Sequence, residues 1–486
     1  MHSFLSKTDI RKLLLITTIE ENFQQKVSIA DIKKRMDVSE FILFSTFEEL
    51  KQDIESYQLS DDIHIEKSNQ TFKLKKNISF STEVLKNIYV KNSLGFQIIQ
   101  DVFEETFTNS SEYAKLFYTS RTKVYNKVNQ LKATLEELGI KLSSRFKLAG
   151  DEVAIRVYMS NLYTYVYGND YYPFSTNFKK QVLHFVKNVE EKTGIYLTQA
   201  SKIKLLYFVS ICQIRTENKK NIKIKPMMER YSEDKYLNKI IKEAHHLSFN
   251  EKINQYDADL LVQFIKGLNE FPLVVEQMEP DLFTKFFITE FQTYFGEIED
   301  ESLSEDLTNG LMKIHYPILT FKRMQTELDV LVQARFVEEN YPEVLEFCHY
   351  LIAKAAKSKK LQLVTQNDIH LLNRYLFLLI NLLPTSFFSI PIKVCIDFTL
   401  GENYNNFIYR NIQTFDFINI EISNQLTDDI DILLCDYTLN DMRDKLKVIV
   451  WSAPPTAGDW AVFGKCIAKA RNDKLLKKGE VARVLS

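Results

Sequence analysis

Glycine and proline are scarce in this chain, which has 12 glycines and 10 prolines among its 486 residues. Because both residues punctuate turns, their scarcity argues against a turn-rich β protein and favours a mostly helical chain. The chain is also longer than one hydrophobic core usually covers, so we expect about three to five domains. Its five cysteines have no paired spacing, which argues against a disulfide framework and indicates a reducing compartment.

Long apolar runs are missing as well. The longest, at residues 375–383, is too short to span a bilayer and predicts a buried helix. The N-terminus lacks the uninterrupted apolar core of a signal sequence, so we expect a cytoplasmic protein without a membrane partner. The sequence has no Walker loop, no dinucleotide glycine fingerprint and no zinc-ligand spacing. We therefore expect no cofactor, no metal and no catalytic residues.

Charge is balanced over the whole chain but not along it. The formal net charge is −2, which excludes a polyelectrolyte binder that acts through its entire surface. Residues 109–150, however, contain eight basic and three acidic side chains, a net charge of +5 by subtraction. Such a local basic patch is the electrostatic footprint of a nucleic-acid contact.

The first 76 residues have the pattern of a winged helix-turn-helix. Apolar residues recur at helical spacing in residues 8–23, and Ser28 and Ser39 are suitable N-caps for two further helices joined by a short turn. Residues 63–76 then alternate like a two-stranded ribbon. This order of elements predicts one winged unit at residues 1–76.

The same order returns at residues 77–165, as a repeat of pattern rather than of sequence. Leading helices precede a short helix, for which Ser110 or Ser111 is a suitable cap. A long helix follows and stops at Gly139, a fitting glycine just beyond a helix C-terminus. A short alternating hairpin completes the second predicted unit.

The long helix at residues 119–137 has the side chains of a recognition helix. Such a helix enters the major groove by its N-terminal residues, where hydroxyls can bind phosphates and Arg or Asn can contact base edges. The candidate DNA-binding residues are Ser120, Arg121, Thr122, Lys123, Tyr125, Asn126 and Lys127 in the helix, and Arg145 and Lys147 in the hairpin. The alternative is an ordinary solvated helix. Within this helix no acidic residue precedes Glu136, and the hairpin that follows is basic. Both features favour DNA binding.

The first unit is a weaker DNA-binding candidate. Its corresponding helix, at residues 39–54, is apolar and acidic and could mainly pack. Lys73, Lys75 and Lys76 in its ribbon could contact phosphates.

The rest of the chain predicts helical bundles and then an α/β domain. Residues 151–385 are helical in pattern, and the acidic stretch at 296–306 is a suitable linker. After Pro391, β-branched runs alternate with short helical segments, which predicts a mainly parallel sheet. The fold class is thus mainly α and multidomain, with bundles at residues 170–292 and 293–386 and a small α/β domain at 390–486.

Residues 148–174, LAGDEVAIRVYMSNLYTYVYGNDYYPF, resemble the junction after the second DNA-binding unit in the Mga/AtxA family. These are global and virulence transcription regulators of Gram-positive bacteria. The order of segments resembles the family over essentially the whole chain: two winged helix-turn-helix units, two regulation domains of the sugar phosphotransferase system (PRD) and a domain similar to enzyme IIB. The resemblance implies binding to double-stranded DNA upstream of promoters, and a dimer or higher oligomer. Because we expect most contacts to be made to phosphates, we also expect low sequence specificity.

The resemblance also implies control through histidine phosphorylation by phosphocarrier proteins of the phosphotransferase system. Two positions that match phosphorylated histidines in this family are Ile203 and Tyr375 here. His315, in LMKIHYPILTFKR, resembles the start of a regulation-domain helix and is the remaining candidate for phosphorylation; His184, His245, His246 and His349 are weaker ones. The alternative for each is a surface or hydrogen-bonded histidine.

The C-terminal domain departs from its enzyme relative. An active enzyme IIB of this class has a cysteine at the end of its first strand, followed by a loop whose amides cradle phosphate. Here Cys395 lies inside the strand, and the following loop is acidic. We expect a binding or assembly domain in which Cys395 and Cys435 are buried apolar thiols.

Two other classes of function compete with a DNA-binding regulator. One is a phosphotransferase-linked signalling protein or RNA antiterminator that does not bind DNA, but antiterminators begin with a small β module and this chain begins with helices. The other is a phosphocarrier of the enzyme IIB kind, which the acidic loop at 396–404 opposes.

Overall fold

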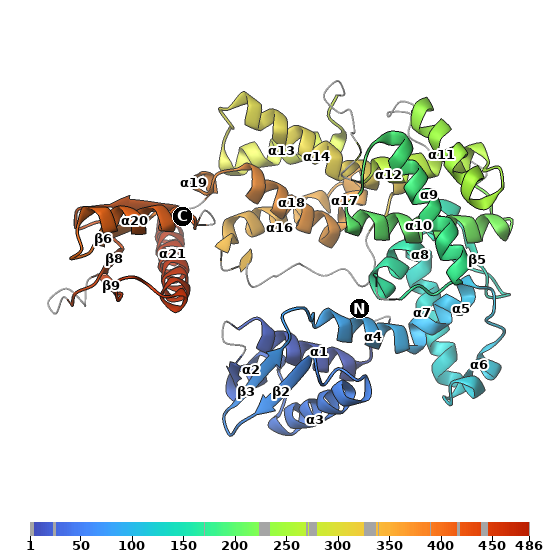
Figure 1. Ribbon diagram of the computed structural model, residues 1–486, viewed down its shortest axis with the longest axis horizontal. Coiled ribbons are helices and arrows are strands. Elements are labelled where there is room, and N and C mark those ends of the chain that lie inside the picture. The colour runs from blue at the N-terminus through green and yellow to red at the C-terminus, as the bar shows by residue number, and fades with distance from the viewer. Residues whose placement is uncertain are drawn as a thin grey trace. The chain divides into compact units, whose positions relative to one another are not determined.

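The computed structural model describes residues 4–22, 26–169, 171–222, 234–268, 271, 279–324, 337–338, 340–388, 390–415, 418–438 and 446–485. The described chain is mostly helical with a few small sheets, which confirms the expected mainly α class (Figure 1). It divides into two compact units. The first contains residues 1–274 and 316–329, and the second contains residues 275–315 and 330–486.

The first unit begins with a winged helix-turn-helix. Its elements are α1 (Lys7–Glu20), β1 (Lys26–Ser28), α2 (Ile29–Met36), α3 (Glu40–Ser56), β2 (Ile63–Lys67) and β3 (Thr71–Lys76). The Ser28 and Ser39 side chains cap α2 and α3 as the sequence predicts, because each accepts a backbone N–H of the first helical turn. The sheet has the order β1-β3-β2 and is antiparallel, so the expected ribbon gains a third strand.

The second winged unit follows with a smaller hairpin. It comprises α4 (Glu83–Asn92), α5 (Leu94–Phe103), α6 (Ser110–Leu116), α7 (Arg121–Glu137), β4 (Ile140–Leu142) and β5 (Leu148–Gly150). One core of aromatic and aliphatic side chains joins these helices to α8 (Glu152–Tyr167). The predicted repeat of helices and hairpin is therefore present.

A helical bundle completes the first unit. Besides α8 it contains α9 (Thr176–Thr193), α10 (Gln199–Glu217), α11 (Lys235–Phe249) and α12 (Gln255–Lys266). Phe208 and Phe264 stack at the centre of its core, with ring centroids 3.7 Å apart. Because α8 contributes to this core and to the preceding one, the second winged unit and the bundle share a helix.

The second unit opens with another set of helices. These are α13 (Leu282–Phe295), α14 (Glu301–Phe321), α16 (Pro342–Ala355), a short 3-10 turn (Lys359–Leu361), α17 (Gln362–Gln366), α18 (Asp368–Leu382) and α19 (Thr385–Phe388). Residues 316–321 of α14 belong to the first unit. The run at 375–383 falls mainly in α18, where Tyr375, Leu376 and Leu379 are buried as expected.

Two sequence-derived boundaries in this region need correction. The boundary proposed between residues 292 and 293 falls inside α13, an uninterrupted helix whose Phe287 and Phe291 pack on Phe347 of α16. The compact units instead divide after residues 274, 315 and 329. The acidic linker expected at 296–306 is only partly a linker, because α14 already begins at Glu301.

The C-terminal domain is a four-stranded parallel sheet with helices, as the pattern predicts. Its elements are β6 (Ile392–Asp397), α20 (Glu402–Ile412), β7 (Ile420–Ser423), β8 (Ile432–Cys435), β9 (Lys447–Val450) and α21 (Ala457–Leu485). The strand order is β7-β6-β8-β9. Val394 and Ile396 of the central strand β6 share one apolar core with residues of α20 and α21. Among the described helices, none is long and apolar enough to cross a membrane.

Candidate nucleic-acid interface

The turn between α6 and α7 is built from local hydrogen bonds. Asn109 caps α6 by accepting from the Ser111 and Glu112 amides, so the cap expected at Ser110 or Ser111 lies one or two residues earlier. Tyr118 in the turn has a φ of 48°, a left-handed conformation that reverses the chain direction. Ser120 then caps α7 by accepting the Lys123 amide at 3.2 Å. These contacts fix where α7 begins.

One side of α7 is committed to the core. Val124, Val128, Leu131 and Leu135 are at most 5% exposed and recur at helical spacing, as the sequence predicts. They pack in the same core as Phe103 of α5 and Tyr113 of α6. The opposite side of the helix is therefore held toward solvent.

The solvent side of α7 carries the predicted DNA-binding side chains. Arg121, Thr122, Lys123 and Asn126 are exposed, and Tyr125 is 58% exposed. Within the described part of the chain, neither Arg121 nor Lys123 takes part in an ion pair. Ser120 is also exposed, and its hydroxyl hydrogen can still be donated while its oxygen accepts from the Lys123 amide. The N-terminal turns of α7 thus present donors and uncompensated positive charge.

Lys127 differs from the other candidates on this helix. It is only partly exposed, and its Nζ atom donates to Oε1 of Gln130 at 2.8 Å. Burial and the nearby Lys123 ammonium lower the pKa of Lys127. Lys127 is therefore less available to solvent than Lys123.

The hairpin after α7 has one exposed candidate and one paired candidate. Arg145, in the turn between β4 and β5, is exposed. The Lys147 ammonium forms an ion pair with Glu105 of the α5–α6 loop, which offsets part of its charge. Arg145 is therefore the more exposed of the two cations.

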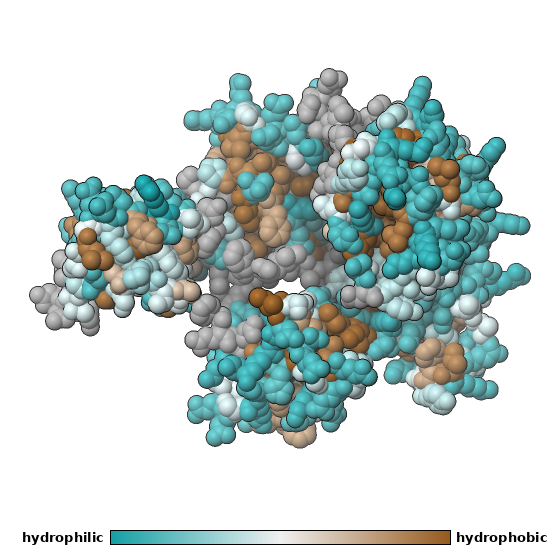
Figure 2. Space-filling model, viewed as in Figure 1, coloured by the Kyte–Doolittle hydropathy of each residue, from teal (hydrophilic) through white to brown (hydrophobic). Residues whose placement is uncertain are grey.

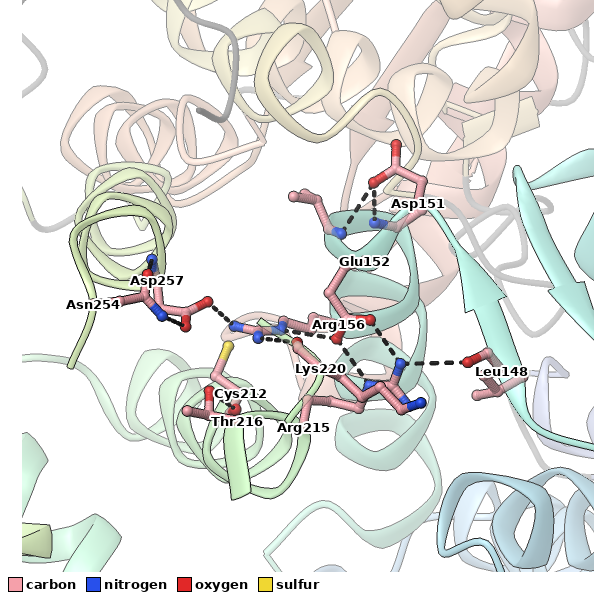
Figure 3. Close-up of polar contacts among 12 residues, drawn as sticks. Leu148, Asp151, Glu152, Arg156, Cys212, Arg215, Thr216, Lys220, Asn254 and Asp257 are labelled. Atoms are coloured by element: carbon pink, nitrogen blue, oxygen red, sulfur yellow. Dashed lines mark hydrogen bonds and ion pairs between the residues drawn. The ribbon is translucent and has the colours of Figure 1, made fainter. Parts of the chain in front are cut away.

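A buried ionic network holds the end of this hairpin (Figure 3). Glu152, in the first turn of α8, accepts from Arg215 of α10 at 2.6 and 2.8 Å and from Arg156 at 3.2 Å. Arg215 also donates to the backbone oxygen of Leu148 in β5. Arg156 and Arg215 are at most 1% exposed, so their charges interact in a medium of low polarity. The wing is thereby tied to the bundle.

The same network continues into α12 of the bundle. Arg156 donates to Asp257 at 2.7 Å and to the backbone oxygen of Lys220 at 3.0 Å. Burial of Arg156 by itself would lower its pKa, but neighbouring groups, among them Cys212, Asp257 and Glu152, raise the pKa instead. The sequence did not predict a role for either arginine. Glu152 and Arg156 lie within residues 148–174, the stretch that resembles the Mga/AtxA family.

His315 lies inside the second unit, fully buried. Its Nδ1 atom lies 2.8 Å from the Thr284 hydroxyl and 3.4 Å from Asp281, and its Nε2 atom lies 2.7 Å from the Tyr375 hydroxyl. Phosphoryl transfer to this imidazole therefore requires that it first leave these hydrogen bonds. Phosphorylation of His315 stays a prediction. Of the weaker candidates, His245 is buried, whereas His184, His246 and His349 are exposed.

The loop after β6 already holds a carboxylate. The backbone N–H and the hydroxyl of Thr399 donate to the two carboxylate oxygens of Asp436, at 3.0 and 2.6 Å. Burial alone would raise the pKa of Asp436, but these hydrogen bonds lower it. Cys395 and Cys435 are buried, and desolvation raises the pKa of both thiols.

The fold and exposed helix define a winged helix-turn-helix of the DNA-binding class. Residues 78–163 match the Mga helix-turn-helix domain. This match supports the resemblance to the Mga/AtxA family over that segment.

Two curated relatives are proteins of Bacillus anthracis. The capsule synthesis positive regulator AcpB is 29% identical over 122 residues, which is 25% of either chain. The capsule synthesis positive regulator AcpA is 23% identical over 197 residues, which is 40% of either chain. The matched stretches thus cover less than half the length of these relatives.

Proposed function

We propose that this protein regulates transcription by binding double-stranded DNA through its second winged unit. The observation that carries the proposal is the exposure of Arg121 and Lys123 at the start of α7, opposite a buried apolar stripe. The match to the Mga helix-turn-helix domain and the names of the two relatives support it. In this proposal α7 enters the major groove by its N-terminal turns, and Arg145 contacts the phosphate backbone from the hairpin.

The remaining parts of the proposal rest on family resemblance. The two helical bundles would act as PRD domains that receive a signal from phosphocarrier proteins, and the C-terminal domain would serve assembly into a dimer or higher oligomer. Two protomers that bind neighbouring sites would multiply weak contacts. The Thr399–Asp436 contacts support a role without phosphoryl transfer in the C-terminal domain, because a carboxylate already accepts the donors that a phosphate would need. We propose no catalytic activity.

Binding to a promoter-length DNA duplex across a salt series tests this function. The variant Arg121→Ala/Lys123→Ala should bind roughly tenfold more weakly or worse, and the slope of log K against log salt should fall by about 2. The matched control is Lys187→Ala/Lys239→Ala, which removes the same charge from exposed positions on α9 and α11. Equal losses in both variants would point to net charge alone. Failure of the wild-type protein to bind DNA would favour the signalling alternative.

A further inference from the structure

The solvent face of the sheet in the first winged unit places two lysines side by side. Lys26 of β1 is the direct antiparallel partner of Lys73 in β3. Side chains of such partners project from the same face of a sheet, and both lysines are exposed. Like charges directly opposite each other destabilise a sheet, so this pair calls for a reason outside the fold.

Glu66 of β2, the direct partner of Lys73 on its other side, offsets only part of the positive charge on this face. Lys75, two residues along β3, projects from the same face and donates to Glu66 of β2 at 2.5 Å. The hydrogen bond from Lys75, together with the weaker fields of His64 and Lys73, lowers the pKa of Glu66. Three lysines thus share one carboxylate. Figure 2 shows a largely hydrophilic surface over this unit, where Figure 1 draws β2 and β3.

Lys76, the third ribbon lysine proposed from the sequence, does not add to the charge of this face. Its ammonium is paired with Glu20 of α1 at 2.5 Å and also donates to the backbone oxygen of Phe80. Lys76 therefore serves the packing of the unit, and the charge available to a ligand comes from Lys26, Lys73 and Lys75.

The helix α3, which corresponds to α7 of the second winged unit, has the opposite character. Its exposed side chains include Glu40, Glu48 and Glu55, against one exposed lysine, Lys51. Phe41 at its N-terminal turn is 83% exposed. Carboxylates along this face would repel DNA phosphates, and the N-terminal turn lacks the Arg and Lys side chains found in α7.

We propose that the first winged unit contacts the phosphate backbone of DNA through the solvent face of its β1-β3-β2 sheet, and not through α3. The inference rests on the proposed function, since the ligand is the same duplex that α7 reads. Lysine contacts to phosphate add affinity without base selectivity. The first winged unit thus acts as an electrostatic anchor, and α7 of the second winged unit carries what sequence preference exists.

The test compares three variants of the full chain with wild type, on the same mixed-sequence duplex across a salt series. The sheet variant Lys26→Gln/Lys73→Gln should lose severalfold in affinity at about 0.1 M salt, and its salt slope should fall by about 2. The α3 variant Phe41→Ala/Lys51→Ala should bind like wild type. The α7 variant Arg121→Ala/Lys123→Ala reports on the proposed function separately.

The outcomes distinguish the two proposals. A sheet variant with the affinity and slope of wild type, beside a weakened α7 variant, would overturn the anchor and leave the proposed function standing. Weaker DNA binding by the α3 variant would show that α3 contacts the DNA. Loss of binding by wild type itself would overturn both. The thermal midpoint of the sheet variant should equal or exceed that of wild type, because the substitutions remove a repulsion; a lower midpoint with weak binding would make misfolding the cause and contradict the inference.

Discussion

Arg156 Nη1 lies 2.7 Å from Asp257 Oδ1, and both side chains belong to residues that are at most 1% exposed. The ion pair joins α8, which follows the wing of the DNA-binding unit, to α12 of the helical bundle. Two charges buried this deeply are costly to separate, because each would be left without compensation in a medium of low polarity. The pair therefore makes the position of α8 depend on the bundle.

Arg156→Met should destabilise the first unit by about 3 kcal/mol, because it leaves the buried Asp257 carboxylate without its main partner. The double variant Arg156→Met/Asp257→Leu should recover much of this loss, since two apolar side chains need no counter-charge. Hydrogen-exchange protection of the α8 amides measures both. As a control, Lys187→Met breaks an exposed pair with Glu191 on α9 and should cost less than about 0.5 kcal/mol. Equal effects of the two single substitutions would contradict the role given to Arg156.

Ser120 combines a structural and a binding role, which two substitutions should separate. Ser120→Ala removes the cap of α7 and should cost about 1 kcal/mol in the protection of its first-turn amides. Ser120→Asp keeps a capping oxygen but adds negative charge where a phosphate is expected. The helix should then be as stable as in wild type, while DNA binding falls roughly tenfold.

Ser39, the cap of α3, supplies the matched control for that experiment. Because α3 is not expected to contact DNA, Ser39→Asp should leave both stability and DNA binding unchanged. Strong DNA binding by the Ser120→Asp variant would show that the start of α7 does not contact DNA.

Asp281 should contribute to stability in acid. Burial by itself would raise the pKa of this carboxyl, but hydrogen bonds from His315 and Thr284 lower it to about 2. A carboxyl with a depressed folded-state pKa stabilises the fold above its unfolded pKa of about 4, and this contribution is lost as pH falls from about 4 to about 2. The change amounts to about 2 kcal/mol. Asp281→Asn should therefore flatten the stability of the second unit over this window.

Asp429 is the control for the acid experiment. Hydrogen bonds from Lys393 and Thr427 also lower its pKa to about 2, but this carboxylate is exposed. Its effect should disappear in about 1 M salt, whereas that of Asp281 should persist, because salt screens exposed pairs far more than buried ones. Urea unfolding at each pH measures both. An Asp281 effect that salt abolishes would mean that the carboxylate is open to solvent.

The buried site of His315 predicts slow labelling by a phosphocarrier protein. Both imidazole nitrogens face hydroxyl groups, so little phosphate should enter His315 while the second unit is folded. Tyr375→Phe removes the group that faces Nε2 and should increase the labelling, as measured by mass spectrometry of peptides. Rapid labelling of His315 in the wild-type chain would show that the imidazole leaves this pocket readily.

Much of the local structure follows from the sequence alone. Ser28, Ser39 and Ser120 cap the helices that the pattern predicts, because a hydroxyl needs only the next backbone turn to form a cap. The buried stripe of α7 follows from the helical repeat that begins at Val124. Gly139 ends the helix region with a φ of 74°, as a residue without a side chain can. These features depend on neighbours within a few residues.

Features that depend on distant partners were decided by the tertiary structure. β1 is a strand because Lys26 pairs with Lys73 of β3, which lies far along the chain. The charge of Lys147 is offset by Glu105, and the imidazole of His315 is enclosed by hydroxyl groups from two other helices. A composition or a helical repeat reports which residue types occur and at what spacing, but not which side chains from other elements approach them. The sequence alone therefore determined which helix faces solvent with its cations, and only the tertiary contacts decided which of those cations remain available to DNA.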